Sequence, residues 1–357
     1  MKEKKITKIL VVLLIMQWAF IQLIALYPSF IEQFYSNGLY VFLNKIYQFL
    51  LGWIPFSFGD ILYLLLIIYL IKEVIFFIKN KSFNFKNVVL KLGAFISVLF
   101  FVFHFNWGLN YYRIGVSEKL NIKIDSYSTN DLELFTKRLI LKINETHILI
   151  TKNDTILVEN PLNKKQIREK SYLVYNEFQQ KFPEFQHHQL HVKNSLFSVP
   201  LAYMGFAGYL NPFTNEAQVN YLIPKNTYTS TVCHELAHQI GIGPESEANF
   251  VGYLAGINSS DLYFQYGAYF NALRYCLNEI FHTNPAAFEA LKSTLNQGIL
   301  KDLQLQQDFW ETYQNWSEKY FKIFYDNFLK ANNQEDGIKS YSKMVVLLVN
   351  YYKTNQL

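Results

Sequence analysis

Three apolar runs near the start of the chain limit what it can fold into more than any other feature. They cover residues 9–27, 61–78 and 88–107 of the 357. A helix of about 20 apolar residues is long enough to cross the hydrocarbon core of a bilayer, and each run approaches that length. The sequence therefore predicts a membrane region, residues 1–107, with three transmembrane helices at these positions.

The positions of the lysines predict how these helices are oriented. The N-terminal segment MKEKKITK and the connection that carries Lys79, Lys81 and Lys86 are both strongly basic, whereas residues 28–60 contain only Lys45. Basic segments beside transmembrane helices remain in the cytoplasm. The first run is too long for the core of a signal peptide and has no evident small-residue cleavage site, which favours a retained anchor. We therefore expect a cytoplasmic N-terminus and an extracytoplasmic domain after the third helix.

Residues 108–357 have the polarity of a water-soluble domain. Although 51% of the chain is hydrophobic, no apolar run beyond residue 107 is long enough to span a bilayer. The net charge of +5 comes from scattered lysines without the basic-aromatic motif of a nucleic-acid-binding protein, so no nucleic-acid partner is expected. Periodic apolar residues predict helices at 131–150, 164–182, 261–280, 288–295, 309–329 and 340–352, and strands at 189–199 and 216–223. This pattern is typical of a mostly helical α+β domain.

The stretch TVCHELAHQIGIGPESEANF, residues 231–250, contains the motif HExxH. Positions four apart lie on one face of a helix, so His234 and His238 can bind the same metal ion. Thr227 or Thr229 is a candidate for the cap at the start of this helix. Histidine combined with carboxylate ligands suits zinc best, and zinc is therefore the expected cofactor.

A catalytic zinc site takes three protein ligands and keeps one position open. Glycines after the motif end the helix, and Pro244 can begin a second helix that brings a carboxylate back to the histidines. We expect Glu247 to be the third ligand. Glu245 is the alternative, although at the helix start it could equally serve as a partner of the helix dipole.

Glu235 is the candidate catalytic residue. It is adjacent to a ligand and points about 100° away from it, so it is placed to act as a general base. It would take a proton from a zinc-activated water and later deliver it to the leaving amine. Tyr269 is the candidate donor to the oxyanion, with Tyr266 and Arg274 as alternatives on the same predicted helix. The strand at 216–223 is a candidate site for edge pairing with an extended peptide.

Five further side chains are of types that bind metals, but their positions in the sequence favour structural or surface roles. Cys233 and Cys276 have no paired spacing and are expected to be buried thiols, although a disulfide stays open for an extracytoplasmic domain. His187, His188 and His191 lie at a predicted helix-to-strand junction, where such clusters are more often surface residues than a second metal site.

The chain resembles an uncharacterised bacterial family of membrane-anchored, zincin-like proteins at HELAHQ, at ESEANFVGYLA, at the upstream GYLNPFTNEAQVN and at NWGLNYYR. That family has three N-terminal transmembrane helices and an extracytoplasmic domain. The resemblance covers most of the chain and implies a gluzincin-type metallopeptidase domain with His234, His238 and Glu247 as ligands. Many gluzincins have an acidic residue four positions after the glutamate ligand. Val251 occupies that position here, and Asn249 is the candidate to orient the ligand instead.

Together these observations predict an α+β, mostly helical, gluzincin-like domain at residues 108–357, outside a bacterial cytoplasmic membrane. The expected function is that of a membrane-anchored zinc-dependent metallopeptidase acting on a peptide or protein substrate. A signalling protease that cleaves one membrane partner would share this chemistry. The alternative from another class is a non-catalytic membrane sensor or scaffold with a structural zinc site, although such a protein has no need of Glu235.

Overall fold

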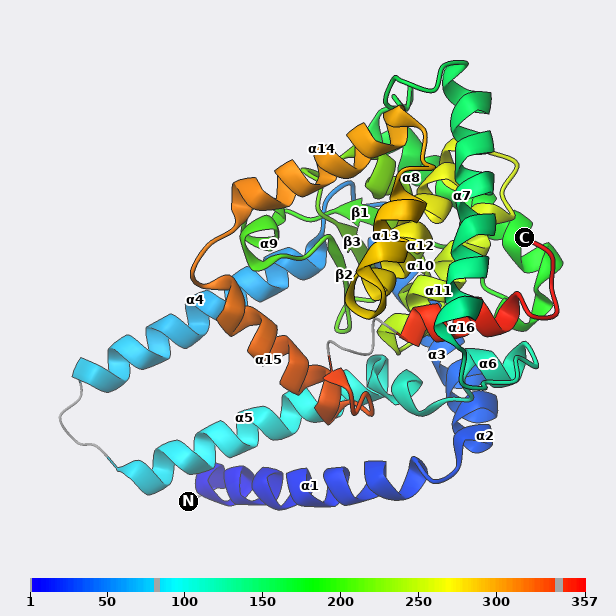
Figure 1. Cartoon of the computed structure of the whole chain (residues 1–357). Helices are drawn as coiled ribbons and strands as arrows, with labels where there is room; N and C mark the ends of the chain where they lie inside the picture. Colours follow the sequence, from blue (N-terminus) through cyan, green and yellow to red (C-terminus); the bar gives the residue numbers. More distant parts are fainter. Residues whose placement is uncertain (1, 80–83, 338–342) are drawn as a thin grey trace. The chain divides into compact units, whose positions relative to one another are not determined.

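The computed structural model describes residues 2–79, 84–337 and 343–357 (Figure 1). Contacts between residues divide the chain into two units. The first consists of Met1–Ile114 together with Asn211–Glu216, and the second of Gly115–Leu210 together with Ala217–Leu357. The short segment Asn211–Glu216 is therefore part of the first unit although the chain on both sides of it belongs to the second.

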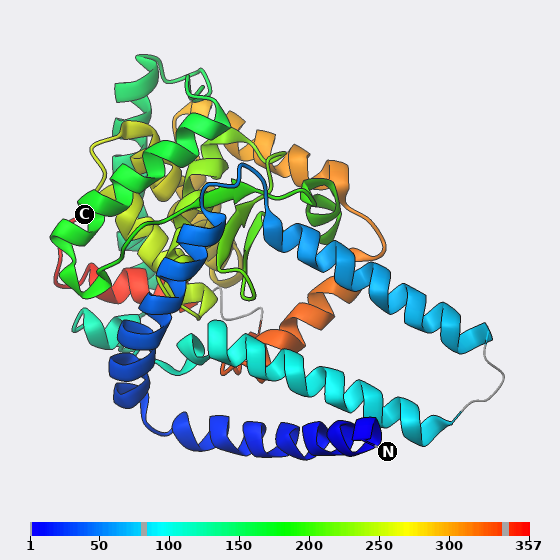
Figure 2. The ribbon, with the colours of Figure 1, turned by 180° about the vertical axis from the view of Figure 1, so that it is seen from behind.

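The first unit contains three helices that are long and apolar enough to cross a membrane, as the sequence predicts. They are α1 (Lys2–Ile24), α4 (Phe58–Lys79) and α5 (Phe85–Asn106). Helices α1 and α5 lie side by side (Figures 1 and 2). Lys81 of the predicted basic connection lies outside the described residues.

A continuous helical stretch between α1 and α4 forms a polar core in the first unit. It comprises α2 (Pro28–Phe30), the π-helix η1 (Ile31–Leu39) and α3 (Tyr40–Leu51), and the 3₁₀ helix η2 (Gly108–Tyr112) follows α5. Just after η2, Arg113 donates to both oxygens of Glu32, at 2.7 Å from Nε and 2.6 Å from one terminal nitrogen. This paired geometry is the strongest arrangement for an arginine and a carboxylate, and both side chains are largely buried.

The segment 211–216 completes this polar core. The Glu216 carboxylate accepts the backbone N–H groups of Phe58 at 3.1 Å and Gly59 at 2.5 Å, so it caps the start of α4. Asn215 donates to the Asn44 side chain at 2.8 Å. Residues distant in sequence thereby supply the partners that α4 and α3 need for their polar groups.

The second unit is mostly helical with a small three-stranded sheet, which confirms the predicted class at that level. Its elements are α6 (Val116–Lys119), α7 (Thr129–Thr151), α8 (Lys164–Lys181), η3 (Pro183–Phe185), β1 (Val192–Asn194), α9 (Ser198–Met204), β2 (Gly208–Asn211), β3 (Glu216–Val219), α10 (Lys225–Gln239), α11 (Glu245–Ile257), α12 (Leu262–Thr283), α13 (Pro285–Lys292), α14 (Gln297–Tyr313), α15 (Glu318–Ala331) and α16 (Lys343–Tyr351). Helix α10 packs against α8, α11 and α12.

The sheet has the order β1-β3-β2, with β1 and β3 parallel and Val192 opposite Ala217. The predicted strand at 216–223 is thus the central strand β3, and the expectation that it pairs with a peptide at a free edge is wrong. Neighbouring strands already occupy both of its sides. The edges of this sheet are β1 and β2.

Local sequence signals explain why the supporting helices begin where they do. Ser128 and Asp131 form a reciprocal capping box at α7, and Asn163 and Gln166 form one at α8. Each box satisfies backbone N–H groups that a helix start leaves without partners. The predicted boundaries of these two helices are accordingly close to the observed ones.

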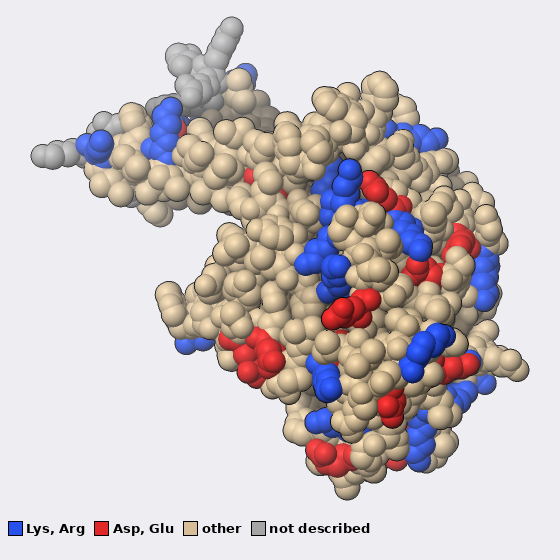
Figure 3. Space-filling model, turned by 90° about the horizontal axis from the view of Figure 1, so that it is seen from above, with Lys and Arg blue, Asp and Glu red and all other residues tan. Residues whose placement is uncertain are grey.

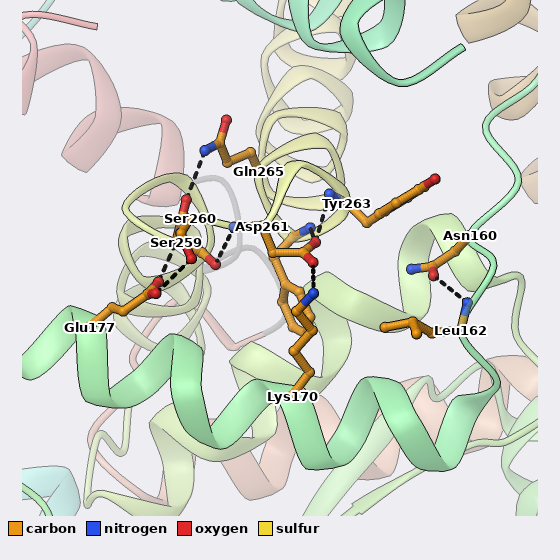
Figure 4. A network of polar contacts seen from close by, with 10 residues as sticks. Asn160, Leu162, Lys170, Glu177, Ser259, Ser260, Asp261, Tyr263 and Gln265 are labelled. Atoms are coloured by element: carbon orange, nitrogen blue, oxygen red, sulfur yellow. Dashed lines mark hydrogen bonds and ion pairs between the residues drawn. The ribbon is translucent and has the colours of Figure 1, made fainter.

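A network of polar contacts joins α8 to the turn before α12 (Figure 4). Asp261 accepts the backbone N–H of Tyr263 at 2.8 Å and forms an ion pair with Lys170. About two turns further along α8, Glu177 accepts the N–H and the hydroxyl of Ser260, at 2.8 and 2.7 Å. These contacts fix α8 and α12 on either side of α10.

Three predicted elements differ in detail. The predicted helix 309–329 is divided between α14 and α15, because residues 314–317 turn the chain. The predicted strand 189–199 is reduced to β1, since α9 already begins at Ser198. Of the predicted helix 340–352, the first three residues lie outside the described part of the chain.

Neither Thr227 nor Thr229 caps α10, because Pro224 occupies that position.

Positive and negative side chains are interspersed over the face drawn in Figure 3. Lysine and arginine alternate there with aspartate and glutamate, so this face has no patch of a single charge. Cys233 and Cys276 are both buried free thiols, as expected, and form no disulfide.

Candidate metal centre

Helix α10 brings His234 and His238 together on one face. Their Nε2 atoms are 3.1 Å apart, and the two rings meet edge to face at an interplanar angle of 88°. The Nδ1 atom of His238 lies 2.7 Å from the carbonyl oxygen of Ile242. A carbonyl can only accept, so Nδ1 carries the hydrogen and Nε2 of the neutral ring presents a lone pair.

Glu245 supplies the carboxylate that faces both histidines. Its Oε2 lies 3.2 Å from Nε2 of His234, and its Oε1 lies 3.5 Å from Nε2 of His238. Gly241, at a φ of +89°, reverses the chain after α10, and Glu245 is the first residue of α11. The reversal is therefore short enough to place the first carboxylate of α11 directly against the motif.

In this structure Glu245, and not the predicted ligand Glu247, faces the two histidines. Residues two apart on a helix point about 200° apart, so Glu245 and Glu247 cannot face the same side. The Oε1 atom of Glu247 accepts the backbone N–H of Val116 at 3.1 Å, at the start of α6. The two carboxylates thus have different roles, and the alternative ligand of the sequence analysis is the one at the histidines.

Residues from the C-terminal part of the chain hold Glu245 in place. The hydroxyl of Tyr325, on α15, donates to Oε1 of Glu245 at 2.6 Å. The backbone N–H of Glu245 donates to the side chain of Gln334 at 3.1 Å. Asn249 donates its side-chain amide to the backbone oxygen of Glu245 at 2.9 Å, while Val251 is fully buried in the core.

Helix α11 approaches α10 unusually closely at His234. A Cβ atom at Gly252 would lie 3.0 Å from the backbone nitrogen of His234 and 3.1 Å from the carbonyl carbon of Cys233. From the other side, the Tyr175 hydroxyl donates to the Cys233 oxygen at 2.5 Å. Gln239, at the end of α10, exchanges two hydrogen bonds of 2.9 Å with the backbone of His191. The half of α10 that carries the motif is therefore fixed from several sides.

Glu235 lies beside the histidines, buried and incompletely hydrogen-bonded. Its carboxylate is within 4.8 Å of the ligand nitrogens of His234 and His238. Its Oε2 makes no hydrogen bond within the described part of the chain. Gly208, at the start of the edge strand β2, borders it so closely that a Cβ there would be 2.5 Å from Oε1. Burial raises the pKa of Glu235 to about 8.

The buried charges at this centre favour a cation. Burial alone would raise the pKa of Glu245, but the histidines outweigh it and hold that pKa well below its usual range. Burial lowers the pKa of His238, but the Glu245 carboxylate outweighs this and raises it to about 9. The pKa of His234 is lowered, chiefly by burial. An ionised carboxylate in this environment requires a positive partner, which either a protonated histidine or a metal ion can provide.

The donor set fits a zinc ion. Zinc bonds to nitrogen and carboxylate oxygen are about 2.0–2.2 Å long, so three ligands in tetrahedral positions lie about 3.3 Å from one another. The two Nε2 atoms are 3.1 Å apart, and the Glu245 carboxylate lies 3.2 Å from that of His234 through Oε2 and 3.5 Å from that of His238 through Oε1. These separations are of the size that the ligands of one zinc ion require.

The predicted oxyanion donors lie elsewhere. Tyr269 packs against Tyr253, with ring centroids 6.3 Å apart, and its pKa is raised by burial and then by Glu145. Tyr266 donates to Asp302 at 2.6 Å in the core. Neither tyrosine has the site histidines among its contacts in the described part of the chain.

Of Arg274 and its neighbour Tyr275, only Tyr275 interacts with Glu245. Burial lowers the pKa of Arg274, and Tyr275 acts against this shift. The pKa of Tyr275 is raised to about 12, first by burial and also by Glu245. Sequence analysis missed Tyr325 and Tyr275, because no spacing relates them to the motif.

The three histidines near β1 do not form a second metal cluster. Within the described part of the chain, the cluster of histidine and carboxylate groups that could hold a metal ion is at His234, Glu235 and His238, and it includes none of these three histidines. His187, His188 and His191 line a pocket of about 230 Å³ beside Tyr172. Burial lowers the pKa of His187 and of His191, which favours their neutral forms.

Comparison with known proteins identifies a family but no activity. The family model described as "Protein of unknown function (DUF3810)" matches residues 35–349. No curated protein and no solved structure matches the chain.

Proposed function

The chain belongs to the DUF3810 family, and from the geometry of its site we propose that it is a membrane-anchored zinc-dependent metallopeptidase of the gluzincin type. The observation that carries this proposal is the convergence of two imidazole nitrogens and one carboxylate at 3.1–3.5 Å beside a buried glutamate. A carboxylate adjacent to a zinc site with an open position is the arrangement that metal-assisted hydrolysis requires.

His234, His238 and Glu245 would hold the ion. When bound, zinc polarises a substrate carbonyl and makes a water molecule more acidic. The hydrogen bond from His238 to Ile242 fixes the orientation of one ligand, and the hydroxyl of Tyr325 fixes that of Glu245. The chain thus supplies both the ligands and the groups that orient them.

Glu235 would act as the general base and then as the acid. Its Oε2 has no hydrogen-bond partner within the described residues. A bound cation would lower the pKa of about 8 that burial gives this carboxyl, and in its ionised form it would accept a proton from an attacking water. Its position on the same helix as two ligands keeps it within reach of a bound substrate. It would then return the proton to the amine that leaves.

An extended substrate would bind along β2. This strand lies at an edge of the sheet, and Gly208 at its start borders the Glu235 carboxylate. Peptides commonly add to a free strand edge through main-chain hydrogen bonds. The outer position of β2 in the sheet, beside the base, supports a peptide rather than a small ester as the substrate class.

The basic N-terminus and the lysines between α4 and α5 support a cytoplasmic location for both segments. With three spans, the second unit would then face the extracytoplasmic space. This orientation is part of the proposal.

The test compares the full-length wild type with Glu235→Gln in lipid nanodiscs. Zinc content is measured by mass spectrometry, and cleavage is measured with a peptide library. We expect one zinc per chain in both proteins and cleavage by the wild type only, abolished by a chelator and restored by zinc. Zinc in both proteins without cleavage by either would favour a structural site in a sensor or scaffold. A wild-type protein that does not retain zinc would refute the metal centre itself.

A further inference from the structure

Helix α15 has an inner face that belongs to the metal centre. Tyr325 on this face donates to Glu245, and its ring packs against Phe206 with centroids 5.0 Å apart. Leu329, one turn further, is completely buried. These contacts fix the helix and determine which side chains it turns outward.

The outer face of α15 is apolar and aromatic. Trp316, just before the helix, is 80% exposed, and Tyr320 and Phe324 are 55% and 71% exposed. Tyr320 and Phe324 are four apart on α15 and therefore lie on one stripe, with the 58% exposed Ile323 beside them. The ring centroids of Trp316 and Tyr320 are 6.1 Å apart. Contiguous exposed apolar side chains of this size indicate an interaction surface rather than ordinary surface variation.

Helix α9 extends this surface. It packs against α15, and its Val199 and Tyr203 are each 46% exposed. The Tyr203 ring packs edge-on against Tyr313, with centroids 5.2 Å apart, and the carbonyl of Tyr203 accepts the Asn315 side chain at 2.6 Å. These contacts hold α9 against the end of α14 and the start of α15.

Lysines accompany the aromatic stripe. Lys319 precedes Tyr320, and its ammonium lies 5.0 Å from the centre of that ring. Lys322 and Lys330 form ion pairs one turn back along the helix, with Glu318 at 2.6 Å and Asp326 at 2.7 Å. The lysines therefore lie beside the aromatic stripe, between it and the buried face that carries Tyr325 and Leu329.

We infer that α15 is an interfacial helix, whose stripe of Trp316, Tyr320, Ile323 and Phe324 lies in the headgroup region of a lipid bilayer. Tryptophan and tyrosine are the side chains enriched at that depth, and a helix with one apolar face and lysines on the other lies in the plane of the interface. The lysines complement anionic headgroups. The same chain contains three helices that are long and apolar enough to cross a membrane, and these would anchor the protein to a bilayer.

A depth-dependent fluorescence experiment tests this inference on the full chain. Cysteine replaces Phe324 in one variant and Leu141 in the control, which is 68% exposed on α7. Both are labelled with an environment-sensitive dye, and Tyr320→Cys provides a second probe in case the first substitution disturbs folding. The native thiols Cys233 and Cys276 are buried, and the unsubstituted protein serves as the labelling blank.

The labelled proteins are reconstituted in nanodiscs of phosphatidylethanolamine and phosphatidylglycerol, with or without lipids that carry a nitroxide near the headgroup. We expect the nitroxide to reduce the Phe324→Cys and Tyr320→Cys emission about twofold and to leave the Leu141→Cys emission unchanged, since quenching requires contact at that depth. Emission that aqueous iodide quenches and the nitroxide does not would overturn the inference. Protection from both quenchers would overturn it in favour of a protein partner or a second copy. Neither reading depends on peptidase activity.

Discussion

The identity of the third ligand depends on a single residue position. Glu245 and Glu247 are both in the first turn of α11, and which of them faces the histidines depends on where the helix begins. Pro244 marks that start in the sequence, but the length of the preceding reversal is set by Gly241 in its left-handed conformation. For this reason, sequence spacing alone could not decide which of the two glutamates faces the histidines.

The two glutamates make a matched pair for testing the metal centre. Glu245→Gln removes the carboxylate charge at the histidines, so zinc affinity should fall by more than the 10- to 100-fold typical of a change outside the ligands. Glu247→Gln should leave the affinity nearly unchanged. Competition titration against a chromophoric chelator measures both. Equal losses in the two variants, or a larger loss in Glu247→Gln, would contradict the assignment.

Tyr325 is separated from Glu245 by 80 residues, and no motif connects them. Its hydroxyl orients the carboxylate at 2.6 Å, so Tyr325→Phe should weaken zinc binding about 10-fold or more without unfolding the protein. Tyr320→Phe, on the exposed side of the same helix, is the control. The same titration decides the question, and unchanged affinity in Tyr325→Phe would show that the hydroxyl has no orienting role.

At the scale of elements, the contact between α10 and α11 depends on Gly252. An alanine there places a methyl group 3.0–3.2 Å from the backbone at Cys233 and His234, and the helices must separate. Overpacking of this kind costs about 1–3 kcal/mol, so Gly252→Ala should lower the unfolding midpoint in denaturant. Lys165→Ala, at an exposed position of α8, should change the free energy of unfolding by less than about 0.5 kcal/mol. Similar unfolding midpoints for both variants would mean that the contact between α10 and α11 tolerates a side chain at position 252.

Helix α14 is joined to the core by a buried carboxylate that should make stability depend on pH. Asp302 accepts the Tyr266 hydroxyl at 2.6 Å and the backbone N–H of Val158 at 3.2 Å, and burial raises its pKa from 3.8 to about 6. The folded protein therefore holds this proton more tightly than the unfolded chain. The resulting stabilisation is complete below pH 3.8 and is lost as the pH rises through about 6.

Unfolding measured from pH 4 to pH 7 should reveal this loss. The wild type should lose on the order of 2 kcal/mol relative to Asp302→Asn, which has no such proton. Asp308→Asn, at an exposed position of the same helix, should follow the wild type. Curves for wild type and Asp302→Asn that remain parallel would exclude the carboxyl as the source.

Element boundaries were predictable where capping residues and apolar spacing mark them in the local sequence. The boxes at Ser128 and Asn163 mark the starts of α7 and α8, and their apolar spacing marks the rest. Strand β1 has three residues and the turn at 314–317 has no proline or glycine, so neither leaves a clear pattern. The central place of β3 in the sheet follows from its pairing with β1, which no local signal encodes.

At the scale of the whole molecule, the three membrane helices were predictable because length and apolarity suffice to identify them. Their orientation is tested by labelling single cysteines in intact spheroplasts with a membrane-impermeant reagent. Lys165→Cys, in the second unit, should react from outside, whereas Lys86→Cys, at the start of α5, should react only after permeabilisation. The reverse pattern would place the metal centre in the cytoplasm.

The capping of α4 by Glu216 has a consequence for how the protein is made. The amide groups at Phe58 and Gly59 leave the ribosome well before their partner carboxylate does. At about 5–20 residues per second, a separation of about 150 residues corresponds to roughly 8–30 seconds of synthesis. During this interval α4 has been synthesised, but its first turn has no cap. The membrane region therefore matures only after most of the chain has been translated, and a protein truncated before residue 211 would never complete it.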